Sequence, residues 1–72
     1  MKTLASLKKG ETGLIKRIAD TRLSSKLLDM GCLPGETVFV RYFAPFGDPM
    51  CVRVSGYDLV LRLNEADNIE LE

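Results

Sequence analysis

The 72-residue chain contains no histidine, so the commonest ligand for transition metals and a frequent catalytic base are both missing. Its two cysteines, Cys32 and Cys51, are too few for the disulfide framework of a small secreted protein, and they form no Cys-x-x-Cys pair. No glycine-rich phosphate loop is present, and neither cysteine has an activating partner at a fixed local spacing. We therefore predict that the chain is not an enzyme and has no catalytic residue, cofactor-binding residue or metal ligand of its own.

An excess of charge of one sign is also missing. Ten basic and ten acidic residues give a formal net charge of +0, so the whole molecule is not drawn to nucleic acid or anionic lipid. Residues 1–36 carry seven Lys/Arg and four Asp/Glu, and residues 37–72 carry three and six, which predicts a dipolar surface. The aromatic residues all lie in the acidic half, so no cation-lined stacking groove is expected and no nucleic-acid partner is predicted.

Long apolar runs are absent as well. No run approaches the roughly 20 residues that a membrane span requires. Charges at Lys2, Lys8 and Lys9 interrupt the N-terminal segment before the apolar part of a signal peptide can form. We therefore expect a soluble, cytoplasmic and reduced protein that does not insert into the membrane. If it takes part in transport, it is not the pore.

The pattern that is present consists of short strands separated by turn residues. The chain has room for one small core, so residues 1–72 are expected to form a single domain. Strands are predicted at 13–18 with a bulge, 38–43, 50–54, 57–63 and 69–71. A helix of about nine residues, capped by Thr21 or Ser24, and a turn capped by Asn64 are predicted after the first and fourth strands. The prediction is a mainly β fold, a small five-stranded barrel with one short α-helix between the first two strands and a helical turn before the last.

The residues at and after the end of the predicted helix each have a conformational role. If the helix stops at Met30, Gly31 takes the left-handed position that follows a helix and Cys32 packs back onto Leu27. Pro34 and Gly35 fit the two central positions of a type II turn. We therefore interpret Gly31, Cys32, Pro34 and Gly35 as a structural junction, and Cys32 as a packing residue.

Four apolar residues are candidates for binding a partner. Leu28 lies about 100° around the helix from Leu27 and is expected at the edge of the core or outside it. Phe46 lies in the predicted hairpin loop of residues 45–49, and exposed loop residues often carry function. Phe39 and Phe43 alternate with Val38, Val40 and Tyr42, so they share the opposite strand face unless barrel curvature buries them. We hypothesise one interaction patch that includes Leu28 and Phe46.

An ordered set of short motifs runs along the whole chain: Leu4, Leu7 and Gly10; Gly13-Leu14-Ile15 with Ile18; Leu27 with Met30-Gly31-Cys32-Leu33-Pro34-Gly35; Pro45-Phe46-Gly47-Asp48-Pro49; and Leu59-Val60-Leu61-Arg62 with Glu65-Ala66 and Ile69. This set closely resembles the ferrous iron transport protein A (FeoA) family. The resemblance implies an SH3-like barrel that serves as a small cytosolic accessory or regulatory protein of a bacterial ferrous iron permease, FeoB, which carries a GTP-binding domain. A similar domain ends the DtxR-type iron-dependent repressors, where it follows a DNA-binding domain that this chain lacks.

Alternatives to permease binding remain open at this point. The chain is alternatively a stand-alone domain that binds or senses a transition metal. Apart from that alternative, a weak or indirect interaction with ferrous iron or another transition metal stays open, although no cofactor is predicted. The residues counted above offer few soft ligands for such a site. An oligomer is also possible, since an uncovered strand favours dimers.

Overall fold

The computed structural model describes residues 2–29 and 33–72. A short 3₁₀ turn, η1 (Leu4–Ser6), comes first. The strands are β1 (Thr12–Ile18), β2 (Thr37–Phe43), β3 (Met50–Val54), β4 (Tyr57–Leu61) and β5 (Ile69–Leu71), and the helices are α1 (Thr21–Asp29) and α2 (Leu63–Ala66). All five predicted strands are present, and the helix lies between the first two of them, as expected.

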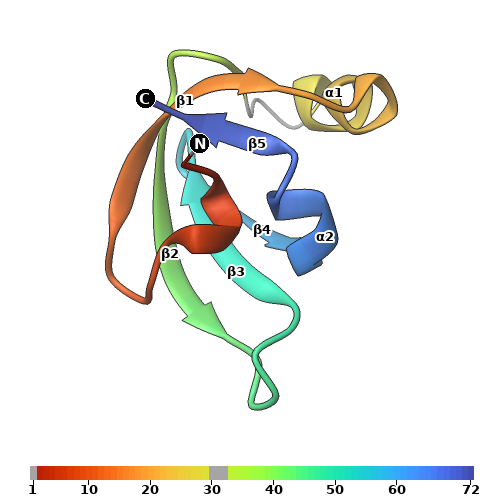
Figure 1. Cartoon of the computed structure of the whole chain (residues 1–72). Coiled ribbons are helices and arrows are strands. Elements are labelled where there is room, and N and C mark those ends of the chain that lie inside the picture. The colour runs from red at the N-terminus through yellow and green to blue at the C-terminus, as the bar shows by residue number, and fades with distance from the viewer. Residues whose placement is uncertain (1, 30–32) are drawn as a thin grey trace.

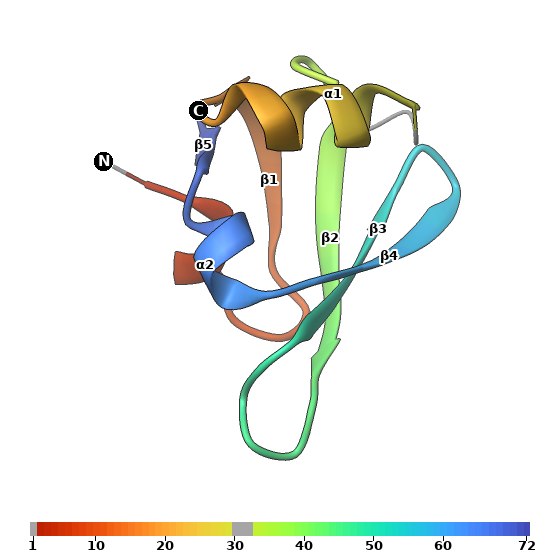
Figure 2. The same cartoon turned by 90° about the vertical axis from the view of Figure 1, so that its right-hand side faces the viewer.

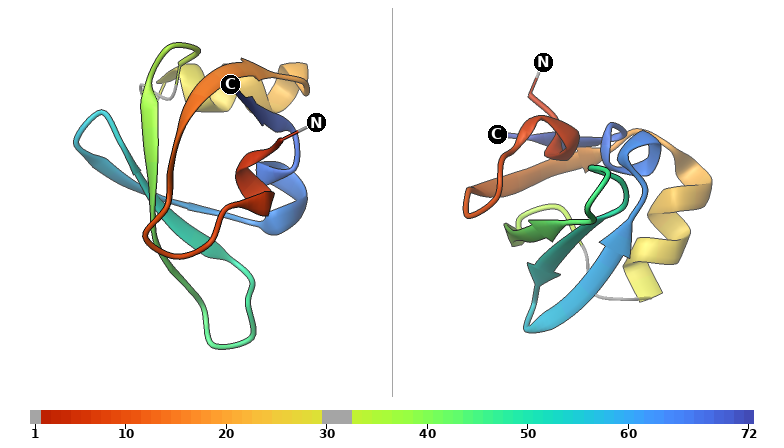
Figure 3. Two further views of the ribbon diagram at one scale, coloured as in Figure 1. Left: turned by 60° about the vertical axis from the view of Figure 1, so that its left-hand side comes forward. Right: turned by 90° about the horizontal axis from the view of Figure 1, so that it is seen from below.

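The five strands form one antiparallel sheet in the order β4-β3-β2-β1-β5. The sheet curls into a barrel, and α2 connects the two strands at its ends, β4 and β5 (Figures 1 and 3). At this seam α2 packs beside η1. The predicted mainly β, five-stranded fold is therefore confirmed.

A bulge in β2 changes which side chains face the barrel interior. The pairing of β2 with β3 shifts between Val40 and Tyr42, so Arg41 is an extra residue on β2. Because side chains alternate along a strand, one extra residue reverses the faces of all that follow. Val40 is buried and Phe43 packs against the core, whereas Tyr42 is exposed. The predicted grouping of Tyr42 with the inward valines is therefore wrong.

The bulge predicted in the first strand is present. The pairing of β1 with β5 shifts between Ile15 and Arg17. Ile15 is buried in the core, and the Arg17 side chain reaches Glu70 on β5, with 3.0 Å between Nε and Oε2. With the bulge between them, Ile15 faces the core while Arg17, two residues later, forms an ion pair across the strands.

The core fills the barrel interior, and α1 closes one end of it (Figure 2). Leu23 and Leu27 lie four residues apart, on one helical face, and both are buried. The buried cluster comprises Leu4, Leu7, Ile15, Leu23, Leu27, Val38, Val40, Met50, Val52, Val54, Leu59, Leu61, Ala66, Ile69 and Leu71.

Both helices begin at residues other than those predicted. The Asp20 carboxylate accepts the backbone N–H groups of Arg22 at 2.9 Å and Leu23 at 3.3 Å, so Asp20 caps α1, and the predicted caps Thr21 and Ser24 are positions within the helix. Thr21 is already the first helical residue. The carboxylate of the residue directly before the helix can accept hydrogen bonds from the free N–H groups of the first turn.

The second helix starts one residue before its predicted cap, Asn64. Leu63 is the first residue of α2, and Arg62 precedes it in an extended conformation. The Glu65 carboxylate accepts the backbone N–H of Arg62 at 3.0 Å, which holds the start of the helix from within its first turn. Leu63 therefore belongs to α2 and not to the preceding strand.

The predicted type II turn is present before β2. Gly35 has a φ of +93°, and the backbone N–H of Glu36 donates to the Leu33 carbonyl at 3.1 Å. The N–H of Gly35 also donates to the Ile15 carbonyl at 2.8 Å, which ties the turn to β1. Gly31 and Cys32, the other two junction residues, lie outside the described residues.

The edge of β5 is covered by the start of the chain. The backbone N–H of Leu71 donates to the Lys2 carbonyl at 2.9 Å, and Thr3 forms a bridge with Glu70. The two ends of the described chain consequently lie side by side (Figure 1). On the other side of the sheet, within residues 2–29 and 33–72, β4 pairs only with β3.

Candidate protein-interaction surfaces

Leu28 projects from α1 into solvent. Its side chain is 59% exposed, whereas the adjacent Leu27 is completely buried. Leu27 shares its helix face with Leu23, and the next residue is rotated out of that face. A leucine this exposed at the end of a small barrel is a candidate contact for a partner.

Phe46 occupies the tip of the hairpin loop between β2 and β3 and is 99% exposed. The backbone N–H of Ala44 donates to the Pro49 carbonyl at 2.9 Å, and that of Gly47 donates to the Ala44 carbonyl at 2.7 Å. These bonds close a defined loop that presents the ring to solvent. The loop and α1 lie at opposite ends of the barrel (Figures 1 and 2). The single patch hypothesised for Leu28 and Phe46 is therefore wrong, and they belong to separate surfaces.

Phe39 and Phe43 lie in different environments, although the alternation along the strand predicted one shared face. Phe39 is 39% exposed on the outside of the sheet, whereas Phe43 is half-buried against the core. The Arg41 bulge lies between them and reverses the alternation. Of the two, Phe39 is the residue that the sheet leaves available for contact.

The outer face of the sheet brings Phe39 together with two residues that sequence analysis did not single out. Tyr42 is 51% exposed and Val60 is 62% exposed. Tyr42 pairs with Cys51, and Cys51 pairs with Val60, so Tyr42, Cys51 and Val60 form a row across β2, β3 and β4. Phe39 lies in the adjacent row, opposite Arg53. Val60 was detectable, because it alternates with the inward Leu59 and Leu61. Tyr42 was not, because its orientation depends on the bulge.

Two arginines share one carboxylate on this face. The Asp58 carboxylate lies 2.8 Å from Arg41 Nη1 and 3.0 Å from Arg53 Nε. The hydrogen bond from Arg53, together with the positive charges of both guanidinium groups, lowers the pKa of Asp58 below its ordinary value of 3.8. In the neighbouring row, hydrogen bonding with the Cys51 thiol raises the pKa of Tyr42.

Replacement of Asp58 is expected to cost stability only where its carboxylate is ionised. Because its pKa is lower in the folded chain than in the unfolded chain, its contribution is fully present above pH 3.8 and is lost as the pH falls through the lowered value. The midpoints of urea unfolding of the wild type and of Asp58→Asn should differ at neutral pH and converge below pH 3.8. A difference that does not change with pH would show that the ion pairs contribute nothing.

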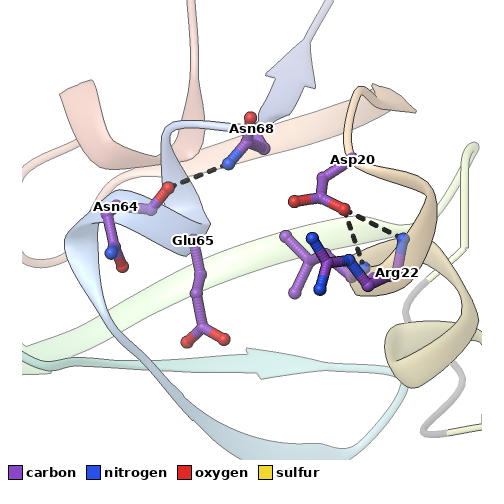
Figure 4. Close-up of a pocket in the computed structure, with 6 residues that line it drawn as sticks. Asp20, Arg22, Asn64, Glu65 and Asn68 are labelled. Carbon is purple, nitrogen blue, oxygen red and sulfur yellow. Dashed lines mark hydrogen bonds between the residues drawn. The ribbon is translucent and has the colours of Figure 1, made fainter.

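A polar pocket lies at the barrel seam, between the start of α1 and α2 (Figure 4). The carboxylates of Asp20 and Glu65 line it, but each already accepts a backbone N–H at a helix start. The side-chain N–H of Asn68 donates to the Asn64 carbonyl at 2.9 Å. Asp20, Glu65 and Asn68 thus hold the ends of the two helices, and among the described residues that line the pocket no nucleophile lies next to a base. The pocket is lined by Asp20, Arg22, Leu23, Asn64, Glu65 and Asn68.

Two features of the described residues bear on metal binding and membrane insertion. Residues 2–29 and 33–72 contain no group of three or more His, Cys, Asp or Glu side chains placed to hold a metal ion. No described helix has the length and apolar character to cross a membrane. Cys51 is buried and forms no disulfide, and Cys32 lies outside the part of the chain that the structure describes.

Comparison with known proteins finds relatives along nearly the whole chain. Residues 2–72 match the family described as FeoA domain. The Fe(2+) transport protein A/Fe(2+) transporter FeoB fusion protein of Porphyromonas gingivalis is 34% identical over 70 residues, which are 96% of this chain and 8% of that protein. The chain thus spans less than a tenth of the length of this curated relative.

Solved structures of similar sequence share the fold. Iron(II) transport protein A from Clostridium thermocellum is 38% identical, with a TM-score of 0.89 over 99% of this chain and 44% of that one. The FeoA protein from Chlorobium tepidum is 33% identical, with a TM-score of 0.93 over 99% of this chain and 69% of that one.

Two more distant structures bear on the fold alone. FeoA of Stenotrophomonas maltophilia, complexed with zinc and described as an SH3 domain protein, is 23% identical, with a TM-score of 0.87 over 100% of this chain and 91% of that one. A manganese-dependent transcriptional repressor is 19% identical, with a TM-score of 0.88 over 99% of this chain and 40% of the repressor. The predicted SH3-like barrel and its likeness to a repressor domain are both confirmed.

Proposed function

This chain belongs to the FeoA domain family, and on that premise we propose that it is an accessory protein of ferrous iron uptake that binds the cytosolic part of a FeoB permease and regulates it. The family is linked to ferrous iron transport. The observation that carries the proposal is the fusion in Porphyromonas gingivalis, in which one chain contains both a segment related to this protein and the FeoB transporter. Covalent linkage keeps two domains at a high effective concentration, which favours an interaction between them.

In this proposal residues 1–72 work as one FeoA-like domain in the cytoplasm, by binding and not by catalysis. It reaches the membrane only through its partner. Leu28 and Phe46 are the leading contact residues, because their side chains are 59% and 99% exposed and apolar. Since they lie at opposite ends of the barrel, each is to be tested separately.

Leu28→Glu is expected to weaken binding to FeoB at least about tenfold, because a central apolar contact is replaced by a charge that must lose its water. The measurement is a binding isotherm of the labelled chain with FeoB of the same genome, purified in nanodiscs. Phe46→Ser, measured in the same way, tests the hairpin tip.

The matched control is Leu14→Glu, which makes the same chemical change at a leucine of β1 that is 42% exposed. Its affinity for FeoB should stay within about twofold of the wild type, while circular dichroism shows that all three variants remain folded. Wild-type affinity in both Leu28→Glu and Phe46→Ser would remove these surfaces from the proposal. No binding by the wild type itself would refute permease binding.

The stand-alone metal-binding domain is tested without FeoB. Calorimetric titration of the chain with ferrous ion under anaerobic conditions is expected to show no tight one-to-one binding. Tight stoichiometric binding would favour a metal-binding or metal-sensing domain over an accessory of the permease.

A further inference from the structure

The outer face of β2, β3 and β4 combines exposed apolar side chains with charged ones. Phe39, Tyr42 and Val60 are 39%, 51% and 62% exposed. Strand pairing places Arg53 directly between Phe39 and Asp58. Aromatic residues and arginine are the types most enriched where proteins bind each other, and solvent-facing sheet positions need neither.

The charges on this face do not cancel. Asp58 is bonded to both Arg41 and Arg53, and the described ion pairs give these arginines no second carboxylate, so the three side chains together carry a net charge of +1. A guanidinium group has five N–H donors and is always protonated. The side chains of Arg41 and Arg53 are 42% and 54% exposed, so a further carboxylate has access to their donors.

We propose that this face, defined by Phe39, Arg41, Tyr42, Arg53 and Val60, docks a protein segment in which an Asp or Glu is flanked by apolar side chains. The carboxylate of that segment binds the two guanidinium groups beside Asp58, and its apolar neighbours pack on Phe39, Tyr42 and Val60. The inference rests on the proposed function only for the identity of the partner, FeoB. It adds the chemistry that the partner segment must have.

The first test uses a peptide and does not depend on FeoB. The ¹⁵N-labelled chain is titrated with acetyl-Leu-Asp-Leu-Phe-amide and, as the matched control, acetyl-Leu-Lys-Leu-Phe-amide. The acidic peptide should shift the amide signals of residues 39–42, 51–53 and 58–60, and the basic peptide should not. The proposal is overturned if neither peptide shifts these signals, if both do so equally, or if the shifts fall elsewhere. A short single-stranded DNA that shifts them more than the acidic peptide would assign the face to nucleic acid and overturn it too.

The second test measures FeoB binding by charge variants. Arg53→Glu should weaken binding at least about tenfold, and Asp58→Asn should strengthen it about two- to threefold, because it removes the competing carboxylate. Lys16→Glu, the same charge reversal at an exposed residue of β1, should leave the affinity unchanged. A purely structural role for the ion pairs predicts instead that Arg53→Glu and Asp58→Asn both weaken binding, and that result would refute the docking face.

The outcomes for the two proposals can be told apart. If Leu28→Glu weakens FeoB binding while Arg53→Glu and Asp58→Asn leave it unchanged, the permease remains the partner and the docking face is refuted. If the wild type does not bind FeoB, the permease proposal fails, and the peptide titration still decides whether this face recognises an acidic segment.

Discussion

Leu27→Ala is expected to lower the free energy of unfolding by about 2–5 kcal/mol, which is the cost of emptying a fully buried leucine site. Leu27 has no exposed surface, and with Leu23 it forms the apolar side of the helix that closes the barrel. A domain of this size has a net stability of only several kcal/mol, so much of the variant should be unfolded at room temperature. Urea unfolding followed by circular dichroism measures the loss.

The neighbouring residue supplies the control for this prediction. Leu28→Ala removes the same atoms from a side chain that is 59% exposed, and its free energy of unfolding should change by less than about 0.5 kcal/mol. Equal destabilisation of Leu27→Ala and Leu28→Ala would mean that the helix does not present the face described for it.

Gly13→Val is expected to destabilise the chain by about 1–3 kcal/mol through overpacking. A Cβ atom built on Gly13 would lie 2.7 Å from Cδ1 of Leu71 and 3.4 Å from Cδ1 of Leu7. Both leucines are buried, so their side chains have little room to move. Thermal unfolding of Gly13→Val should show a lower midpoint than the wild type and a fold that is otherwise unchanged.

A double variant distinguishes overpacking from loss of glycine as such. Leu71→Ala creates space where the new side chain must go, so Gly13→Val and Leu71→Ala together should cost less than the sum of the two single changes. Strict additivity would show that the close approach of these two residues has no energetic consequence.

The strands could be predicted from the sequence because their apolar residues alternate and their ends carry turn residues. Leu59 and Leu61 face inward and Val60 between them faces solvent, which is the alternation expected of a strand. The β2 bulge could not be predicted in this way. The position of the bulge depends on the register in which β3 pairs with β2, and the sequence of residues 37–43 alone does not determine that register.

The helix starts were placed wrongly for a local reason. Several side chains near each start are able to accept a backbone N–H, and the sequence alone does not decide which one reaches it. In the structure Asp20 takes this role for α1, ahead of both Thr21 and Ser24.

Exposure of the candidate contact residues was easier to predict than their arrangement. Helical rotation identified Leu28 as lying outside the core, and the loop position identified Phe46. Whether two such residues meet depends on how the barrel orients α1 against the hairpin between β2 and β3. That orientation is set by long-range packing, so it cannot be predicted from the periodicity of apolar residues within either segment.

The pairing of the chain's two ends has a consequence for the speed and order of folding. Lys2 bonds to Leu71, and Arg17 on β1 pairs with Glu70 on β5, so completing the sheet requires contacts between residues more than fifty positions apart. Closing so long a loop costs conformational entropy before the contacts between its ends can form and offset that cost. Folds rich in such distant contacts therefore fold in milliseconds to seconds instead of microseconds. During synthesis, the sheet described here stays incomplete until Ile69–Leu71 has left the ribosome, and until then the edge of β1 that will receive β5 is open to other strands.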